Sequence, residues 1–87
     1  MRAVITVVGH DKIGIIYEVS RVLAKNDVNI LDISQTIMQD MFTMIMLVEI
    51  KTDTLKKVNE ELMELEKEMN LSIHLQNEEL FNSMHRI

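Results

Sequence analysis

The residues whose types could bind a ligand or take part in chemistry form one short polar segment, Gly9 to Gly14, which reads GHDKIG. It joins a run rich in β-branched residues to a run with helical spacing. A turn that leads into a helix presents free backbone N–H groups and the positive end of the helix dipole, which favour an anion. Gly14 would let a ligand approach the backbone closely. The segment fits either a corner that binds a small molecule or a plain connection in which the glycines serve only the turn.

Other chemistries at this segment are less well supported by the residue types. Adjacent side chains such as His10 and Asp11 rarely face one metal ion, and no third ligand is evident. An acid–base site of His10, Asp11 and Lys12 would also need a pocket and convergent partners. His74 and His85 are interpreted as surface residues. We therefore predict no catalytic residue, no metal and no cofactor.

The first half of the chain predicts the elements that position this corner. Residues 2–8 are dense in β-branched side chains and predict a strand. A helix is expected next, because apolar residues recur on one helical face at Ile15, Val19, Val22 and Leu23. Asn26 is expected to end it in a left-handed conformation. Residues 28–39 predict a long strand whose imperfect alternation indicates a bend or bulge.

The second half predicts a hairpin, a helix and a last strand. Asp40-Met41 is the expected turn, and residues 42–50 form a strand apolar on both faces, which is typical of a central position. The segment 52–54 offers an N-cap for a helix with apolar positions Leu55, Val58, Leu62, Leu65 and Met69. Residues 71–76 alternate as a strand. Asn77 is expected to cap a short tail helix that covers part of the domain with Leu80, Phe81, Met84 and Ile87.

This order predicts a ferredoxin-like α+β domain, β-α-β-β-α-β, with a four-stranded antiparallel sheet, two helices on one face and a short C-terminal helix. We expect residues 1–77 to form the ligand-binding domain and residues 78–87 an amphipathic tail helix. A right-handed crossover places Asn29 at the end of the sheet opposite the Gly9–Gly14 turn, so the two would meet across a dimer or through a bent loop. Apolar residues on both sheet faces favour self-association.

Composition narrows the class of protein further. A length of 87 residues fits one domain, and the absence of cysteine excludes a disulfide framework. A net charge of −5 with three aromatic residues lacks the basic, stacking footprint of a nucleic-acid-binding protein. No run has the length of a signal peptide or a membrane span. We therefore expect a cytoplasmic protein that binds neither nucleic acid nor a membrane.

The segment VITVVGHDKIGIIYEVSRVLAKNDVNILDIS, residues 4–34, resembles the opening of an ACT domain, the small regulatory module attached to many enzymes of amino-acid metabolism. The strand FTMIMLVEI and the helix after it are similar too, so the resemblance covers residues 1 to about 77. It is closest to stand-alone ACT-domain proteins. It extends to the N-terminal domains of formyltetrahydrofolate deformylase and the glycine cleavage repressor.

The resemblance implies a homodimer with an amino-acid site at the subunit interface, built from the first strand–helix turn and the start of the second strand. The implied ligand-binding residues are Gly9, His10, Asp11, Lys12, Ile13, Gly14, Ile15, Asn29 and Ile30. Asp11 stands where the serine-sensing ACT domain of phosphoglycerate dehydrogenase has an asparagine, and Gly9 where it has a polar side chain. These departures leave the identity of the ligand open. An Asp11 carboxylate would favour an ammonium group, and the turn amides a carboxylate.

Two hypotheses follow for function. The first is a non-catalytic regulatory domain that binds a small molecule, most simply an amino acid, as a homodimer or higher homo-oligomer. Its rival is a protein-interaction subunit that docks on a metabolic enzyme and whose ligand site is vestigial. Titration with a panel of amino acids separates them.

Overall fold

The computed structural model describes residues 1–10 and 13–84, and its elements follow the predicted order. The elements are β1 (Arg2–His10), α1 (Ile15–Lys25), β2 (Asn29–Met38), β3 (Met41–Glu49), α2 (Leu55–Met69), β4 (Ser72–Asn77) and α3 (Glu78–Met84). The strands form one antiparallel sheet in the order β2-β3-β1-β4. The predicted ferredoxin-like class is therefore confirmed, with β3 in a central position as its two apolar faces indicated.

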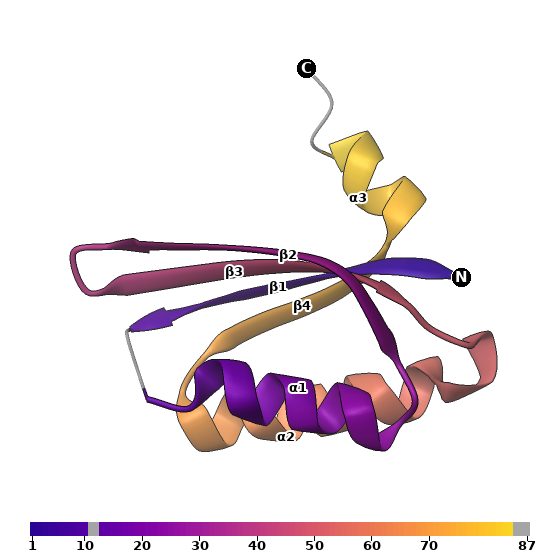
Figure 1. Ribbon diagram of the computed structural model, residues 1–87, viewed down its shortest axis with the longest axis horizontal. Coiled ribbons are helices and arrows are strands. Elements are labelled where there is room, and N and C mark those ends of the chain that lie inside the picture. Colours follow the sequence, from indigo (N-terminus) through magenta and orange to yellow (C-terminus); the bar gives the residue numbers. More distant parts are fainter. Residues whose placement is uncertain (11–12, 85–87) are drawn as a thin grey trace.

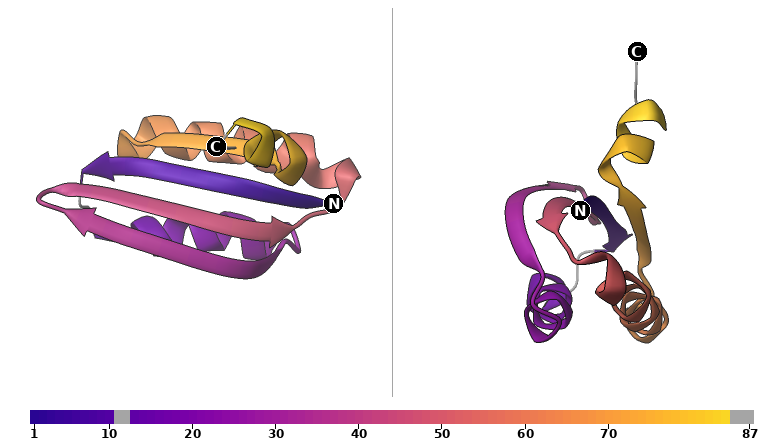
Figure 2. Two further views of the ribbon diagram at one scale, coloured as in Figure 1. Left: turned by 90° about the horizontal axis from the view of Figure 1, so that it is seen from above. Right: turned by 90° about the vertical axis from the view of Figure 1, so that its right-hand side faces the viewer.

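The two long helices cover one face of the sheet, and α3 lies on the other (Figures 1 and 2). The core between sheet and helices is built by the alternation of the strands and the apolar stripes of the helices. Strand β3, for example, buries Phe42, Met44, Met46 and Val48. From the helices, Ile15, Val19, Val22, Leu23, Val58, Leu62 and Leu65 complete this core. These are the positions that helical spacing predicted.

A polar contact links the ends of the two long helices. Asn26 is buried, and its side-chain amide donates to the Val22 carbonyl at 2.8 Å and to Glu61 Oε1 at 3.4 Å. Lys25 Nζ lies 3.1 Å from Glu61 Oε2. Partial burial acts to raise the pKa of Glu61, but the hydrogen bonds from Lys25 and Asn26 and the charges of Lys25 and Lys57 lower it below 4.5.

Three element ends differ from the sequence predictions. The left-handed residue after α1 is Asp27, with φ 57°, because the helix ends in a Schellman motif: the Asp27 N–H donates to the Ala24 carbonyl and the Val28 N–H to the Leu23 carbonyl. The hairpin turn lies at Gln39-Asp40, one residue earlier than expected, with Gln39 at φ 58°. No side-chain hydrogen bond caps α2. Instead a short 3₁₀ turn precedes it, and the Thr54 hydroxyl donates to the Lys51 carbonyl at 2.9 Å.

The two edges of the sheet differ in how well they are covered. Strand β4 has six residues, and near its start the Ile73 N–H donates to Glu66 Oε2 of α2 at 2.7 Å. Strand β2 has ten residues, all of them exposed, including the apolar Ile33 and Ile37. The predicted irregularity in β2 is confirmed as a register shift between Ile30 and Asp32. Strand β2 is therefore the long, open edge of this sheet.

Helix α3 covers part of the outer sheet face. As predicted, Asn77 caps it: its Oδ1 accepts from the Leu80 N–H at 2.6 Å. The helix contacts β1 and β4, and Val4, which alternation places on this face, is 5% exposed. Leu80 and Met84 remain half exposed, so the covering is partial; Ile87 lies outside the described residues. Within the described part of the chain, no helix combines the length and apolar character needed to cross a bilayer.

Candidate functional site at the start of helix α1

The structure brings some of the predicted site residues together and separates others. Gly9 and His10 end β1, where they pair with Phe42 and Met41 beside the β2–β3 hairpin. Asn29 begins β2 and pairs with Glu49, whose other partner is Arg2, at the far end of the same sheet. Ile30 follows Asn29 there. Within one chain, Asn29 and Ile30 thus lie away from the corner, as the right-handed crossover required. The predicted residues Asp11 and Lys12 lie outside the described part of the chain.

Gly14 forms the open rim of the corner. It is the N-cap residue of α1 at φ 90° and ψ 3°, and no side-chain cap hydrogen bond is formed there. Its carbonyl accepts from the Glu18 N–H at 2.9 Å. A Cβ built on Gly14 would meet no atom within 4 Å. Space is therefore open around Gly14, and the N–H groups of residues 15–17 precede the first intrahelical donor, Glu18.

Gly9 has a structural role that the sequence did not indicate. It lies within β1 rather than in the turn, and a Cβ there would stand 2.4 Å from Leu71 Cδ2. Leu71 is buried in the core, so the missing side chain of Gly9 leaves the space that Leu71 fills. Gly9 therefore contributes packing next to the corner.

His10 and Ile13 flank the corner on its exposed side. His10 Nδ1 lies 3.3 Å from Asp40 Oδ2 of the hairpin turn, and both side chains are largely exposed. This contact ties the end of β1 to the hairpin tip. Ile13 is fully exposed.

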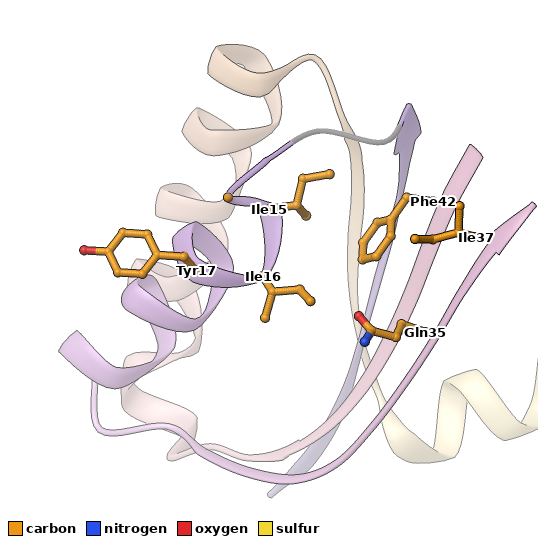
Figure 3. A pocket seen from close by; sticks show the side chains of 7 residues that line it. Ile15, Ile16, Tyr17, Gln35, Ile37 and Phe42 are labelled. Carbon is orange, nitrogen blue, oxygen red and sulfur yellow. The ribbon is translucent and has the colours of Figure 1, made fainter. Parts of the chain in front are cut away.

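A cleft of about 590 Å³ opens between the start of α1 and the hairpin strands. It is lined by Gly14, Ile15, Ile16, Tyr17, Gln35, Ile37 and Phe42. In Figure 3, Ile15 and Ile16 face Phe42 and Ile37 across the cleft, whereas the Tyr17 ring points away from the strands. The volume falls within the range of small-molecule sites in proteins. Two of the predicted residues, Gly14 and Ile15, therefore line this cleft.

Sequence reasoning missed the opposite wall of this cleft. Gln35, Ile37 and Phe42 come from β2 and β3, which read as ordinary strand residues. The signal that could have found them is topological: antiparallel pairing of the first and third strands places the hairpin tip beside the end of the first strand. Phe42 pairs with Gly9 of β1, and across the hairpin Ile37 pairs with Phe42 and Gln35 with Met44, so the register places this wall beside the corner.

The chemistry available in the cleft is that of binding. Most of its lining side chains are apolar, and the amide of Gln35 points into it in Figure 3. The accessible start of α1 adds backbone N–H groups suited to a carboxylate. Among the described residues, no group of three or more histidine, aspartate or glutamate side chains is arranged to hold a metal ion.

Comparison with known proteins gives a consistent result. A family model described as an ACT domain matches residues 2–76. A UPF0237 protein of Clostridium acetobutylicum is 53% identical over 89 residues, with 100% of both chains covered. Among solved structures, an ACT domain protein from Streptococcus pneumoniae is 36% identical, with a TM-score of 0.80 over 93% of each chain.

Two further structures correspond to the resemblances seen in the sequence. A putative glycine cleavage system transcriptional repressor is 29% identical with a TM-score of 0.80, over 86% of this chain and 44% of that one. A formyltetrahydrofolate deformylase from Pseudomonas putida is 13% identical with a TM-score of 0.79, over 87% of this chain and 28% of that one. At that identity the deformylase shares the fold. Both resemblances are confirmed.

Proposed function

Because the chain belongs to the ACT domain family, we propose that it is a non-catalytic regulatory domain that binds an amino acid or a similar small molecule as a homodimer. The observation that carries this proposal is the cleft at the start of α1, with Gly14 open at its rim. The ligand carboxylate binds the N–H groups of the first turn of α1, and the rest of the ligand lies between α1 and the hairpin strands. Gly14 and Ile15 are the predicted residues that this arrangement uses directly.

The open edge of β2 supports the homodimer. A long edge strand with exposed apolar side chains is a template for pairing with another chain. Antiparallel pairing of two β2 strands about a two-fold axis forms one continuous sheet and is self-complementary. The other edge is less suited, since β4 is short and Glu66 already accepts a hydrogen bond from Ile73.

The same pairing supports a site shared between two copies. In an antiparallel β2–β2 pair, the start of one strand approaches the end of the other. Asn29 and Ile30 of the second copy then lie near Ile37, which lines the cleft of the first. We propose on this basis that Gly9 to Ile15 of one copy and Asn29 with Ile30 of the other form the complete ligand corner.

This arrangement also supplies a route for regulation. Strand β2 is at once a wall of the cleft, through Gln35 and Ile37, and the edge that pairs with the second copy. A ligand that joins α1 to β2 restrains this edge, so ligand affinity and dimer affinity are coupled. Such couplings are typically about 1–3 kcal/mol, or 5- to 150-fold in affinity. A partner enzyme of amino-acid metabolism would respond to this ligand-dependent change in the dimer. The complex would be cytoplasmic.

Isothermal titration calorimetry against the twenty amino acids at millimolar concentration tests the proposal. We expect saturable binding of at least one amino acid by the wild-type chain. Ile16→Glu, which places a carboxylate at the cleft, is expected to weaken that binding at least tenfold. Met63→Glu on α2 is the matched control, because Met63 is similarly exposed and does not line the cleft. Absence of binding across the panel would contradict the proposal.

A protein-docking role is the second candidate, and one observation favours it. Leu80 and Met84 of α3 are exposed, and so is Ile45 on the outer sheet face, which leaves apolar surface free after α3 has packed. On this view residues 78–87 are a docking tail and residues 1–77 a domain with a vestigial ligand site. Capture of one stoichiometric enzyme partner, insensitive to all added amino acids, would favour this candidate over the first.

A further inference from the structure

We infer that the ligand of this cleft is an amino acid whose side chain is apolar, and that affinity rises with the apolar surface of that side chain. This inference rests on the proposed function and adds to it the class of ligand. It follows from the apolar side chains that line the cleft between α1 and the hairpin, and from the absence of charge among those described side chains.

The two facing walls of the cleft are aliphatic and aromatic. Ile15 and Phe42 form its floor, since they are 2% and 5% exposed. Ile16 and Ile37 form its upper walls and are 41% and 58% exposed, so their surface is available for contact. Figure 3 shows these four side chains directed toward the same space. An apolar ligand side chain placed there removes both its own surface and theirs from water.

No charged side chain is among the residues that line the cleft, within the described part of the chain. The charged groups of the described residues nearby already have partners. Glu18 pairs with Arg21 at 3.0 Å, and Asp40 with His10 at 3.3 Å. Two polar side chains line the cleft. Gln35 is a neutral amide that can donate and accept and points into the cleft, and the Tyr17 ring is directed away from the strands.

These walls select against polar ligand side chains by desolvation. A charged side chain that enters loses water and finds no opposite charge among the lining residues, which is strongly unfavourable. A short side chain, as in glycine or serine, leaves the isoleucine surfaces in water. Each methylene that fills the cleft is expected to tighten binding by about fourfold when fully buried. Affinity should therefore rise in the order glycine, alanine, valine, leucine.

The test is calorimetric titration of the wild-type chain with two sets of amino acids. In the aliphatic set we expect leucine to bind at least about tenfold tighter than alanine, with valine between them. In the second set, asparagine and aspartate have nearly the shape of leucine but are polar or charged, and we expect each to bind at least tenfold more weakly. A preference for serine, asparagine or a charged amino acid over leucine would overturn the inference.

Ile37→Asn links the preference to the cleft. Ile37 is exposed in the single chain, so the substitution should leave the fold intact while it reduces leucine affinity about tenfold and narrows the difference in affinity between leucine and asparagine. Ile45→Asn on the opposite sheet face is the control, with an exposed isoleucine removed outside the cleft. Equal loss in both variants would contradict the assignment to this cleft.

The outcomes also separate this inference from the proposed function. Saturable binding of a polar amino acid that Ile16→Glu abolishes would retain the regulatory domain and reject the apolar ligand. Absence of binding by every amino acid would reject both. Leucine binding that Ile37→Asn weakens and Ile45→Asn preserves supports both.

Discussion

At Gly9 and Gly14, a hydrogen in place of a side chain serves two different purposes. Gly14 adopts a positive φ that side chains rarely allow, with open space around it. Gly9 makes room for Leu71 in the core. Sequence alone left open whether these glycines served a turn or a ligand. Their surroundings show that Gly9 serves packing, whereas Gly14 leaves the start of α1 accessible.

The Gly9 packing contact can be measured by a double-mutant cycle. Gly9→Ala places a methyl group against Leu71 Cδ2, and we expect a loss of about 1–2 kcal/mol in the free energy of unfolding. In the Leu71→Val background, which lacks δ carbons, the same change should cost clearly less. Urea denaturation of the four proteins gives the coupling energy. Identical costs in both backgrounds would show that Leu71 is not the obstacle.

Glu61 predicts a pH dependence of stability. Its pKa is below 4.5 in the folded chain, so the unfolded chain binds the proton first as the pH falls. The stabilisation is therefore present above about pH 4.5 and is lost as the pH falls through the folded pKa. Because Lys25 is half exposed, we expect the stabilisation from the Glu61 contacts to be less than about 1 kcal/mol. Denaturation of wild type and Glu61→Gln should show a stability difference at pH 7 that shrinks toward pH 3. A difference that stays constant over this range would contradict the account.

At the scale of elements, β2 combines two roles that other strands of the sheet do not share. It is an edge with ten exposed residues, and it supplies Gln35 and Ile37 to the cleft. The β2–β3 hairpin places these residues opposite α1, although they are far from the corner in sequence. An element that is both wall and edge is suited to couple a ligand to an interface.

Pairing through β2 predicts the effect of a charge on that strand. Ile33 is exposed on β2, and in a two-fold β2 pair Ile33→Lys brings like charges from both copies close together. We expect wild type to sediment as a dimer at about 100 μM and Ile33→Lys to sediment largely as a monomer, with its melting curve otherwise cooperative. Met63→Lys on α2 should remain dimeric. A monomeric wild type, or a variant that dimerises equally well, would refute pairing at β2.

Helix α3 depends on its cap and on contacts with the sheet. A seven-residue helix is marginal alone, and the Asn77 side chain holds its first turn. We expect Asn77→Ala to lower the free energy of unfolding by about 1 kcal/mol and to reduce hydrogen-exchange protection in α3. Asn77→Asp keeps the acceptor oxygen, so it should retain most of the free energy of unfolding and most of the hydrogen-exchange protection in α3. Unchanged protection of the Leu80 amide in Asn77→Ala would show that the cap contributes nothing.

At the scale of the whole molecule, the apolar periodicity of the sequence predicted the core, and the pairing of distant strands brought the walls of the candidate site together. The stripe of Ile15, Val19 and Val22 predicted α1, and the imperfect alternation within residues 28–39 predicted the irregularity of β2. Details set by tertiary contacts were not predicted. The Asp27 and Val28 N–H groups bond back to the Ala24 and Leu23 carbonyls, so Asp27 rather than Asn26 takes the left-handed conformation.

The cleft wall was missed for a similar reason. Gln35, Ile37 and Phe42 gain their role from the register between strands, which residue types along one strand do not reveal. The first wall, at Gly14 and Ile15, was visible because glycine before a helical stripe has a local meaning. Local signals thus identified one half of the candidate site, and pairing between distant strands supplied the other.

The most direct test of the account follows backbone amide resonances of the ¹⁵N-labelled chain during titration with leucine. We predict that the saturable shifts concentrate at the start of α1, around Ile15 and Ile16, and in the hairpin strands at Gln35, Ile37 and Phe42. Shifts that concentrate elsewhere, or spectra that stay unchanged with leucine and with every other amino acid, would contradict a ligand site between α1 and β2.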